Sequence, residues 1–271
     1  MKVMGIVNVT PDSFSDGGEF FDHEKAIEHG LELVRDGADV LDIGGESTRP
    51  GAAEEVSLEE ELRRVIPVVE GLAGAAPVSI DTTKAEVAAA AIDAGAAMVN
   101  DVTAFRGDMD MAAVCAGTGV EVVLMHMLGT PRTMQRDPRY RDVVAEVAEF
   151  LAVQVGLAET AGVARERIWI DPGIGFGKTV DHNLSLLRWT GAFARMDLKV
   201  LVGPSRKSFI GKLSNDASES RRLGGTIAAC LAAMEGGAEM VRVHDVAEVA
   251  QAIRVASAIG SANGEPGGGP E

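Results

Sequence analysis

Four side chains whose chemistries suit one flat heterocycle stand at the ends of four separate apolar runs. They are two carboxylates, one amide and one ammonium: Asp81, Asn100, Asp171 and Lys207. A carboxylate accepts two parallel N–H bonds from an amino-pyrimidinone edge, an Asn amide supplies one donor and one acceptor, and lysine reaches a ring carbonyl or nitrogen. A strand-end Asp caps the next helix about as often as it binds a ligand, and Asp81, followed by two threonines, keeps both interpretations open.

Three further residues suit an anion. Arg242 and His244 follow the last apolar run of the chain, and Asn8 follows the first. Two cationic or donor groups beside an amide can hold a phosphate or diphosphate, and an Asn amide oxygen is a ligand that a divalent cation accepts. Helix capping explains Asn8 equally well, whereas Arg242 and His244 fit the anion site better.

A glycine-rich stretch follows one of the strand-end carboxylates. It reads Asp171-Pro-Gly-Ile-Gly-Phe-Gly-Lys178 and lacks the spacing of a P-loop. We interpret it as a tight turn that brings backbone and Phe176 over a planar ligand. The sequence has neither the His and Cys spacing of a structural zinc site nor a Gly-x-Ser-x-Gly elbow, which favours positioned transfer over nucleophilic hydrolysis.

These residues need elements that bring distant parts of the chain together. Eight short apolar runs alternate with stretches of helical periodicity, and Gly37 and Gly95 are typical helix stops. The predicted strands are Val3–Val7, Val40–Ile43, Val78–Ile80, Met98–Val99, Val120–Leu124, Ile168–Ile170, Val200–Val202 and Met240–Val243. We predict an α/β fold, a single (β/α)8 TIM barrel, whose strand ends meet on one face. An open doubly wound sheet is the alternative, because a sequence does not show closure.

Length and composition fit one barrel domain. The chain has 271 residues, and such barrels run to about 250 residues as a single domain. We predict a catalytic domain over residues 1–259 and a flexible Gly- and Pro-rich tail over residues 260–271, which has no apolar face to bury. Long connections at residues 10–21 and 47–57 follow the first two strands and are candidate lids over the catalytic face.

Charge and cysteine content narrow the partners and the compartment. The formal net charge of -16 argues against nucleic acid and anionic membranes as partners. No apolar run approaches the roughly 20 residues of a membrane helix, and no secretory signal opens the chain. Cys115 and Cys230 lie in helix-like stretches and are interpreted as buried free thiols. We therefore expect a soluble, cytoplasmic protein.

Eight stretches that contain these residues resemble the dihydropteroate synthase family of folate biosynthesis, in the family's order and over almost the whole chain. They are residues 4–18 (MGIVNVTPDSFSDGG), 42–51 (DIGGESTRPG), 79–82 (SIDT), 100–102 (NDV), 125–127 (MHM), 171–178 (DPGIGFGK), 205–208 (SRKS) and 242–246 (RVHDV). Together these motifs are highly specific.

The resemblance implies a transferase that condenses 6-hydroxymethyl-7,8-dihydropterin diphosphate with p-aminobenzoate by an SN1-like substitution. It implies a pterin site made of Asp81, Asn100, Asp171, Lys207, Met125 and Phe176. The diphosphate would lie against Asn8, Arg242 and His244 together with Mg²⁺, for which Asn8 is the implied ligand. The implied catalytic residues are Asp81, which stabilises the developing cation, Lys207, and Asp16, which helps to order magnesium or the incoming amine.

The resemblance also gives the long loops a role. The implied p-aminobenzoate site consists of Phe14, Thr48, Arg49, Pro50, Phe176 and Ser208, and sulfonamides, which mimic p-aminobenzoate, would compete there. The family further suggests a homodimer that forms through the outer helices, and the Ala-rich Gly225–Met234 stretch is compatible with it, although such a stripe is more often core packing.

Two other functions fit part of this pattern. A methyltetrahydrofolate-dependent methyltransferase on a pterin-binding barrel would share Asp81, Asn100 and Asp171 but would not need the long loops or the residues 205–208. A non-catalytic paralogue would bind pterin without condensing it, and the presence of Arg49, Lys207 and the anion-binding residues argues against it.

Overall fold

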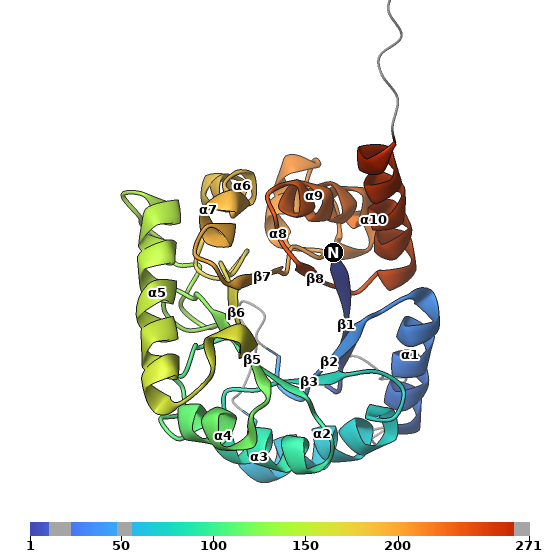
Figure 1. The fold of residues 1–271 in the computed structure, drawn as a ribbon. Coiled ribbons are helices and arrows are strands. Elements are labelled where there is room, and N and C mark those ends of the chain that lie inside the picture. The colour runs from blue at the N-terminus through green and yellow to red at the C-terminus, as the bar shows by residue number, and fades with distance from the viewer. Residues whose placement is uncertain (11–22, 48–55, 263–271) are drawn as a thin grey trace, which may run out of the picture.

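Eight parallel strands close into a barrel in the computed structural model, which describes residues 1–10, 23–47 and 56–262 (Figure 1). Each strand pairs with its neighbours in chain order, and the last pairs with the first. The predicted TIM barrel is therefore confirmed, and the open sheet is wrong. The strands are β1 Lys2–Asn8, β2 Val40–Gly44, β3 Val78–Asp81, β4 Met98–Asp101, β5 Glu121–Met125, β6 Ile168–Asp171, β7 Lys199–Val202 and β8 Met240–Val243.

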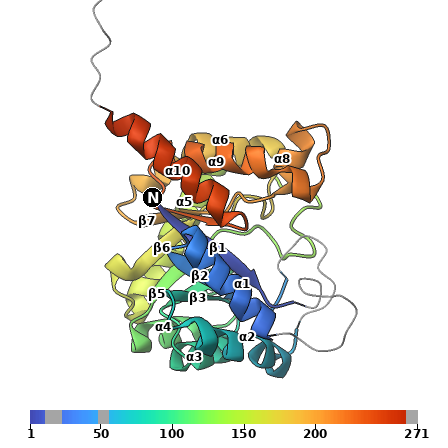
Figure 2. The same cartoon turned by 90° about the vertical axis from the view of Figure 1, so that its right-hand side faces the viewer.

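Helices surround the barrel on the outside (Figure 1). They are α1 His23–Asp36, α2 Leu58–Leu72, α3 Ala85–Asp93, α4 Met111–Thr118, α5 Val143–Ala161, α6 Val180–Arg188, α7 Thr190–Ala194, α8 Ser208–Leu213, α9 Leu223–Glu235 and α10 Val246–Ser261. The last helix packs against α1 and β1, which completes the helical ring (Figure 2). In the described part of the chain, no helix has both the length and the apolar character needed to cross a membrane.

Local sequence explains where these elements end. Gly37 and Gly95 follow α1 and α3 with φ of +107° and +110°, a conformation that glycine adopts without steric cost, so both predicted helix stops are confirmed. Several strands run one or two residues further than predicted, because polar residues such as Asp81 and Asp171 still take part in the ladder. The final helix reaches Ser261, two residues into the predicted tail, and residues 263–271 lie outside the described residues.

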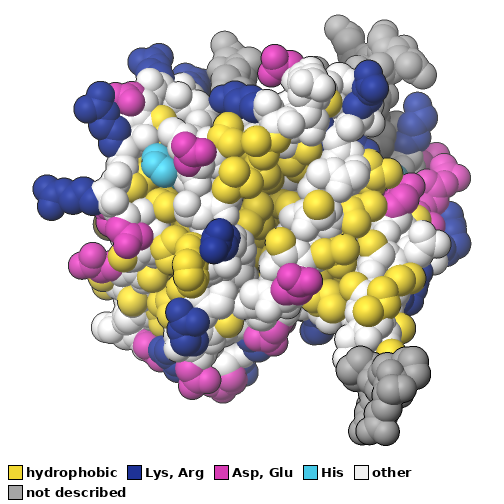
Figure 3. All heavy atoms as spheres, turned by 90° about the horizontal axis from the view of Figure 1, so that it is seen from above, with side chains coloured by type: hydrophobic (Ala, Val, Ile, Leu, Met, Phe, Trp, Pro, Cys, Tyr) yellow, Lys and Arg dark blue, Asp and Glu magenta, His cyan; other side chains and the backbone are white. Residues whose placement is uncertain are grey.

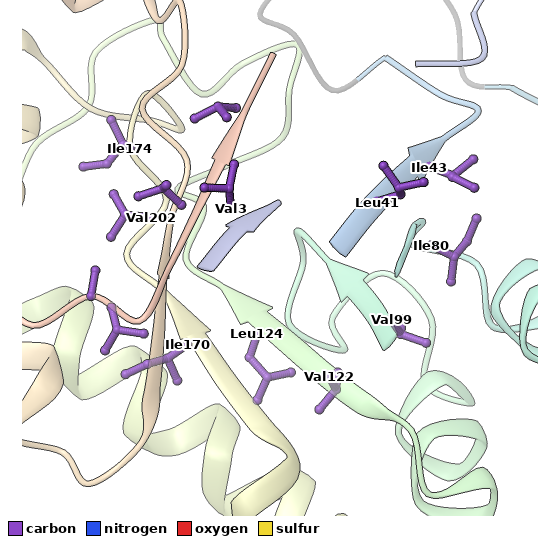
Figure 4. Packing of buried hydrophobic residues seen from close by; sticks show 14 of the residues in the cluster. Val3, Leu41, Ile43, Ile80, Val99, Val122, Leu124, Ile170, Ile174 and Val202 are labelled. Atoms are coloured by element: carbon purple, nitrogen blue, oxygen red, sulfur yellow. The ribbon is translucent and has the colours of Figure 1, made fainter. Parts of the chain in front are cut away.

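The two faces of each strand carry different residues because side chains alternate along a strand. The outward side chains, among them Ile43, Ile80, Leu124 and Ile170, form the main core with the helices (Figure 4). The inward side chains near the strand starts form an apolar plug: Met4, Val40, Met98, Val123, Trp169, Leu201 and Met240.

A polar layer lies on top of this plug for a simple geometric reason. Four of the plug residues are each followed, two positions later and on the same face of the strand, by a polar residue. These polar residues are Asp42, Asn100, Asp171 and Arg242. The plug excludes water from below, so these polar groups interact with one another and with whatever enters from the carboxyl end of the barrel. The fold thus places the chemistry at one face, as the strand-end pattern predicts.

Candidate active site

A cavity of about 440 Å³ opens at the carboxyl end of the barrel. Seven of the residues predicted for the site line it: Asn8, Asp81, Phe176, Lys207, Ser208, Arg242 and His244. Three others, Met125, Asn100 and Asp171, are buried directly beneath or beside this cavity without lining it. The predictions for Phe14, Asp16, Thr48, Arg49 and Pro50 lie outside the described residues.

An ionic network forms the floor of the cavity. The Arg242 Nε donates to Asp42 Oδ2 at 2.5 Å, and one terminal nitrogen of the same guanidinium donates to Asp81 Oδ2 at 2.8 Å. The Asn100 amide nitrogen donates to the same Asp42 oxygen at 3.1 Å. Asp81 does not cap the following helix, whose N-cap is Lys84, so the ligand-binding interpretation of Asp81 is the one that the geometry favours.

Burial changes the acidity of both predicted pterin-binding carboxyls. It raises the pKa of Asp81 to about 7, although the Arg242 guanidinium lowers it, and the nearby Asp42 carboxylate adds to the rise. Burial also raises the pKa of Asp171 to about 6, against the lowering effects of the Gly173 N–H and the Lys207 ammonium. Near neutral pH these carboxyls respond strongly to charge, so a ligand that brings N–H donors or positive charge favours their ionised form.

The stretch after β6 is a tight turn, as predicted, and side chains around it hold it in place. Asp171 Oδ1 accepts from the Gly173 N–H at 2.7 Å, and Asn183 Oδ1 accepts from the Gly175 N–H at 2.7 Å. Tyr140 donates to the Gly177 carbonyl at 2.9 Å. Gly173 has a φ of +69°, and a Cβ there would lie 1.9 Å from the His126 carbonyl oxygen, so only glycine fits this position.

This turn presents an aromatic wall to the cavity. Phe176 packs against Val102, Met125, Met127 and Met134, and the Lys207 Nζ lies 4.1 Å from the centre of its ring. A cation over an aromatic face is held by the ring quadrupole. The predicted places of Phe176 and Met125 beside a planar ligand and of Lys207 at the cavity are consistent with this arrangement.

His126 turns away from the cavity and holds the turn from behind. Its Nδ1 lies 3.0 Å from the Lys178 Nζ, which also donates to the Phe176 carbonyl at 2.9 Å. Burial, followed by the Lys178 charge, lowers the pKa of His126 to about 3, so its ring nitrogen accepts the bond. Burial lowers the pKa of the Lys178 ammonium to about 7. The sequence does not predict this pair, because Lys178 appears in it only as the last residue of the glycine-rich stretch and lies 52 residues from His126.

The opposite side of the cavity suits an anion. His244 Nδ1 lies 2.9 Å from the Ser205 hydroxyl, and Asn8 lines the cavity with them. Among the described residues, no group of three or more His, Cys, Asp or Glu side chains has a metal-binding arrangement. Asn8 lines this side of the cavity, and an amide oxygen is one of the oxygen ligands that divalent cations accept.

Two ion pairs that share the half-buried Lys84 support the rim of the cavity. Glu46, which lines it, accepts from the Lys84 Nζ at 2.7 Å, and the same Nζ donates to the buried Glu61 at 2.6 Å. Thr82 donates to the second oxygen of Glu61 at 2.7 Å. These contacts fix the chain at Glu46, immediately before the second long connection.

Asp42 and Ser205 are hydrogen-bonded to predicted site residues but are not themselves among the residues that the sequence predicts for the site. Asp42 appears in the sequence analysis only within the stretch 42–51, although a lone Asp within an apolar run, two residues beyond an inward Val40, signals an inward charge. Ser205 was part of a motif without a role of its own. Its hydroxyl is also hydrogen-bonded to the His244 backbone N–H at 3.2 Å, and nothing in the local sequence indicates that contact.

Comparison with known proteins identifies one family of enzymes. Residues 4–244 match the family described as pterin binding enzyme. A dihydropteroate synthase of Synechocystis sp. is 49% identical over 259 residues, which cover 95% of this chain and 89% of the relative. The structure of a Xanthomonas albilineans dihydropteroate synthase with 4-aminobenzoic acid is 49% identical with a TM-score of 0.90 and covers 96% of this chain and 93% of that chain. The structure of a Yersinia pestis dihydropteroate synthase with a sulfonamide drug is 43% identical, also with a TM-score of 0.90, over 96% and 94% of the two chains.

Proposed function

The chain belongs to the dihydropteroate synthase family of pterin-binding enzymes, and from this premise we propose how its residues divide the work of the reaction. The activity of the family joins 6-hydroxymethyl-7,8-dihydropterin diphosphate to p-aminobenzoate and yields 7,8-dihydropteroate and diphosphate. The observation that carries the assignment of roles is the Asp42–Arg242–Asp81 network at the floor of a cavity whose other wall is Phe176 and Lys207.

The pterin is held by Asp81, Asn100, Asp171 and Lys207. Two buried carboxyls with raised pKa values favour N–H donors of the amino-pyrimidinone edge as partners, because such donors satisfy oxygens that water reaches poorly. The ring lies against Phe176, and Met125 packs with that side chain to support it. The apolar plug below keeps the pocket dry, which strengthens each of these interactions.

The diphosphate is held by Arg242, His244 and Asn8. The Arg242 guanidinium donates to both Asp42 and Asp81, and of these two carboxyl groups only Asp81 lines the cavity. An entering diphosphate competes with Asp81 for that guanidinium, because phosphate oxygens accept strong charge-assisted hydrogen bonds. Mg²⁺, which Asn8 would help to hold, supplies further neutralisation of the leaving group when it is bound.

The substitution is SN1-like: the bond between the pterin methylene carbon and the diphosphate oxygen breaks first, and the aniline nitrogen then attacks the resulting cation and loses a proton. Asp81 stabilises the positive charge that develops on the pterin, since an ionised carboxylate in a dry pocket interacts strongly with it. Arg242 and His244 stabilise the negative charge that develops on the diphosphate. Asp16 helps to order magnesium or the incoming amine.

p-Aminobenzoate binds at the outer part of the cavity, against Phe176, Lys207 and Ser208. The proposal is supported by the position of these three side chains around one opening and by the positive charge that Lys207 offers to the carboxylate. The family pattern assigns Phe14, Thr48, Arg49 and Pro50, which lie outside the described residues, to the same substrate. Sulfonamides compete with p-aminobenzoate here, as the Yersinia pestis complex suggests for this chain.

We further propose a homodimer and a cytoplasmic setting. Apolar side chains spread over the face on which α6, α9 and α10 lie (Figure 3). Trp189 and Ile259, at the end of α6 and in α10, are exposed, which leaves apolar surface for a second copy. Both cysteines, Cys115 and Cys230, are free and buried, which suits a reducing compartment.

One assay tests the activity. Purified protein is mixed with Mg²⁺, the pterin diphosphate and p-aminobenzoate, and dihydropteroate and released diphosphate are both measured. We expect stoichiometric formation of the two products. A protein that binds the pterin diphosphate but yields neither product at high enzyme concentration would be the non-catalytic paralogue. Methyl transfer from methyltetrahydrofolate in place of condensation would indicate the methyltransferase.

A further inference from the structure

We propose that Asp42 is a positioning residue that holds the Asn100 amide and the Arg242 guanidinium in the orientation in which they bind the pterin and the diphosphate. The inference deepens the proposed function and rests on it, because it assigns Asp42 to act through two residues that bind ligand there. Asp42 is fully buried on β2 and does not line the cavity. Its side chain is hydrogen-bonded to Asn100 and Arg242, which are assigned to the two ligands, so it acts on substrate through them.

One oxygen of Asp42 joins two strands that lie far apart in the sequence. Asp42 Oδ2 accepts from Asn100 on β4 at 3.1 Å and from Arg242 on β8 at 2.5 Å. These donors are 58 and 200 residues away from Asp42 along the chain. The Asp42 carboxylate is thus hydrogen-bonded both to a predicted pterin residue and to a predicted diphosphate residue. Among the described groups that do not line the cavity, it is the only one with both bonds.

The bond to Asn100 decides which atom this residue offers to a ligand. An ionised carboxylate can only accept, so Asn100 must turn its NH₂ group toward Asp42. Its carbonyl oxygen is then the atom left to face the pterin, where it accepts from a ring N–H. An amide at position 42 would lose this control, because it can itself donate to the Asn100 oxygen and allow the Asn100 amide to turn over.

The bond to Arg242 fixes the plane of the guanidinium. Nε is held by Asp42, so the terminal nitrogens point away from it, and one of them reaches Asp81 at 2.8 Å. Phosphate is bound best when a guanidinium presents two N–H groups side by side. When the diphosphate replaces Asp81 as a partner, the Asp42 bond keeps Arg242 at the cavity in that orientation.

A purely structural role makes a different kinetic prediction. A general weakening of the barrel would change the affinity for every substrate, including p-aminobenzoate. The hydrogen bonds that the described residues show for Asp42 run to Asn100 and Arg242, whereas Phe176, Lys207 and Ser208 surround the proposed p-aminobenzoate site. A positioning role therefore changes the constants for the pterin and the diphosphate and leaves those for p-aminobenzoate unchanged.

The experiment compares Asp42→Asn with Ser79→Ala in steady-state assays of the full-length enzyme. Ser79 is the register partner of Asp42 on β3, and its buried hydroxyl has no hydrogen-bond partner among the described residues, which makes it a matched control. For Asp42→Asn we expect the KM for pterin diphosphate and the Ki of inorganic diphosphate to rise about tenfold, the order expected for the loss of a hydrogen bond to a charged group. The KM for p-aminobenzoate should stay within about twofold, and Ser79→Ala should change no constant by more than about twofold.

Unchanged pterin and diphosphate constants in folded Asp42→Asn would overturn the proposal, as would an equal rise in all three constants. Its failure is distinguishable from that of the proposed function, which fails if the unmodified protein forms no dihydropteroate.

A binding cycle isolates the route through Asn100. In the otherwise unmodified protein, Asp42→Asn should weaken the binding of 6-hydroxymethylpterin, measured by calorimetry. In a protein that already carries Asn100→Ala, adding Asp42→Asn should weaken this binding by less than about a further twofold. A fully additive effect would contradict action through Asn100.

A measurement on the unmodified protein keeps the proposal testable if Asp42→Asn does not fold. Hydrogen exchange of the Asn100 side-chain NH₂, followed by NMR, should be at least about tenfold slower than that of the exposed Asn215, because Asp42 accepts from it inside the barrel. Equal exchange rates for the two side chains would overturn the proposal.

Discussion

Replacing Arg242 with Met removes a guanidinium that contacts two buried carboxylates. Its bonds to Asp42 and Asp81 measure 2.5 and 2.8 Å, and its own side chain is 21% exposed. Removing one partner of a buried ion pair costs about 3–5 kcal/mol, because the remaining charge is left uncompensated. We expect Arg242→Met to lose stability of this order above neutral pH, together with most of its affinity for diphosphate.

The loss should depend on pH in a direction that follows from Asp81. Burial raises the pKa of Asp81 from the ordinary 3.8 to about 7. Between these two pH values the native state therefore keeps a proton that the unfolded chain has released. The contribution of Asp81 to stability therefore falls as pH rises, by about 1.4 kcal/mol per pH unit for one proton, and levels off once the pH exceeds the folded pKa. Without Arg242, which lowers that pKa, the fall should continue well above pH 7.

The assay is urea unfolding followed by the fluorescence of the buried Trp169, at several pH values from about 5 to about 9. The control is Arg63→Met, which removes a 2.8 Å ion pair with Glu60 from a side chain that is 53% exposed and should cost less than about 1 kcal/mol. The reasoning is refuted if Arg242→Met is no less stable than Arg63→Met at pH 8, or if its stability has the same pH dependence as that of the unmodified protein.

Three other substitutions test the remaining parts of the site. Lys207→Ala should raise the KM for pterin diphosphate about tenfold or more, since it removes a charge-assisted contact; near-normal turnover at low substrate would contradict its role. Phe176→Ala should raise the KM for p-aminobenzoate by about tenfold through lost apolar contact, which steady-state kinetics would detect, and an unchanged KM would place p-aminobenzoate elsewhere. Gly173→Ala puts a Cβ 1.9 Å from the His126 oxygen and should cost more than about 2 kcal/mol in thermal unfolding. Gly156→Ala, in the middle of α5 with nothing within 4 Å of the added Cβ, should instead stabilise by about 0.5–1 kcal/mol, and equal effects of the two changes would count against the tight turn.

Much of the fold is local information and was therefore accessible from the sequence. The apolar runs and the helical spacing between them predict all eight βα units, and Gly37 and Gly95 end their helices with the positive φ that glycine tolerates. The polar residues at the strand ends, such as Asp81 and Asp171, identify the catalytic face, because every parallel strand of a barrel ends on the same side.

The partners of these side chains were decided only by the tertiary structure. Closure of the barrel brings Arg242 to Asp42 and Asp81, which lie 200 and 161 residues away in the chain, and no local pattern encodes the tilt and register that set this contact. The pKa of Asp81 also depends on the tertiary structure. Burial raises this pKa to about 7, and the side chain is buried only once the barrel is formed. By itself the sequence determined which chemical groups stand at the carboxyl ends of the strands, since residue type and strand alternation are local; the closed barrel decided which of these groups bind one another, since that depends on positions in space.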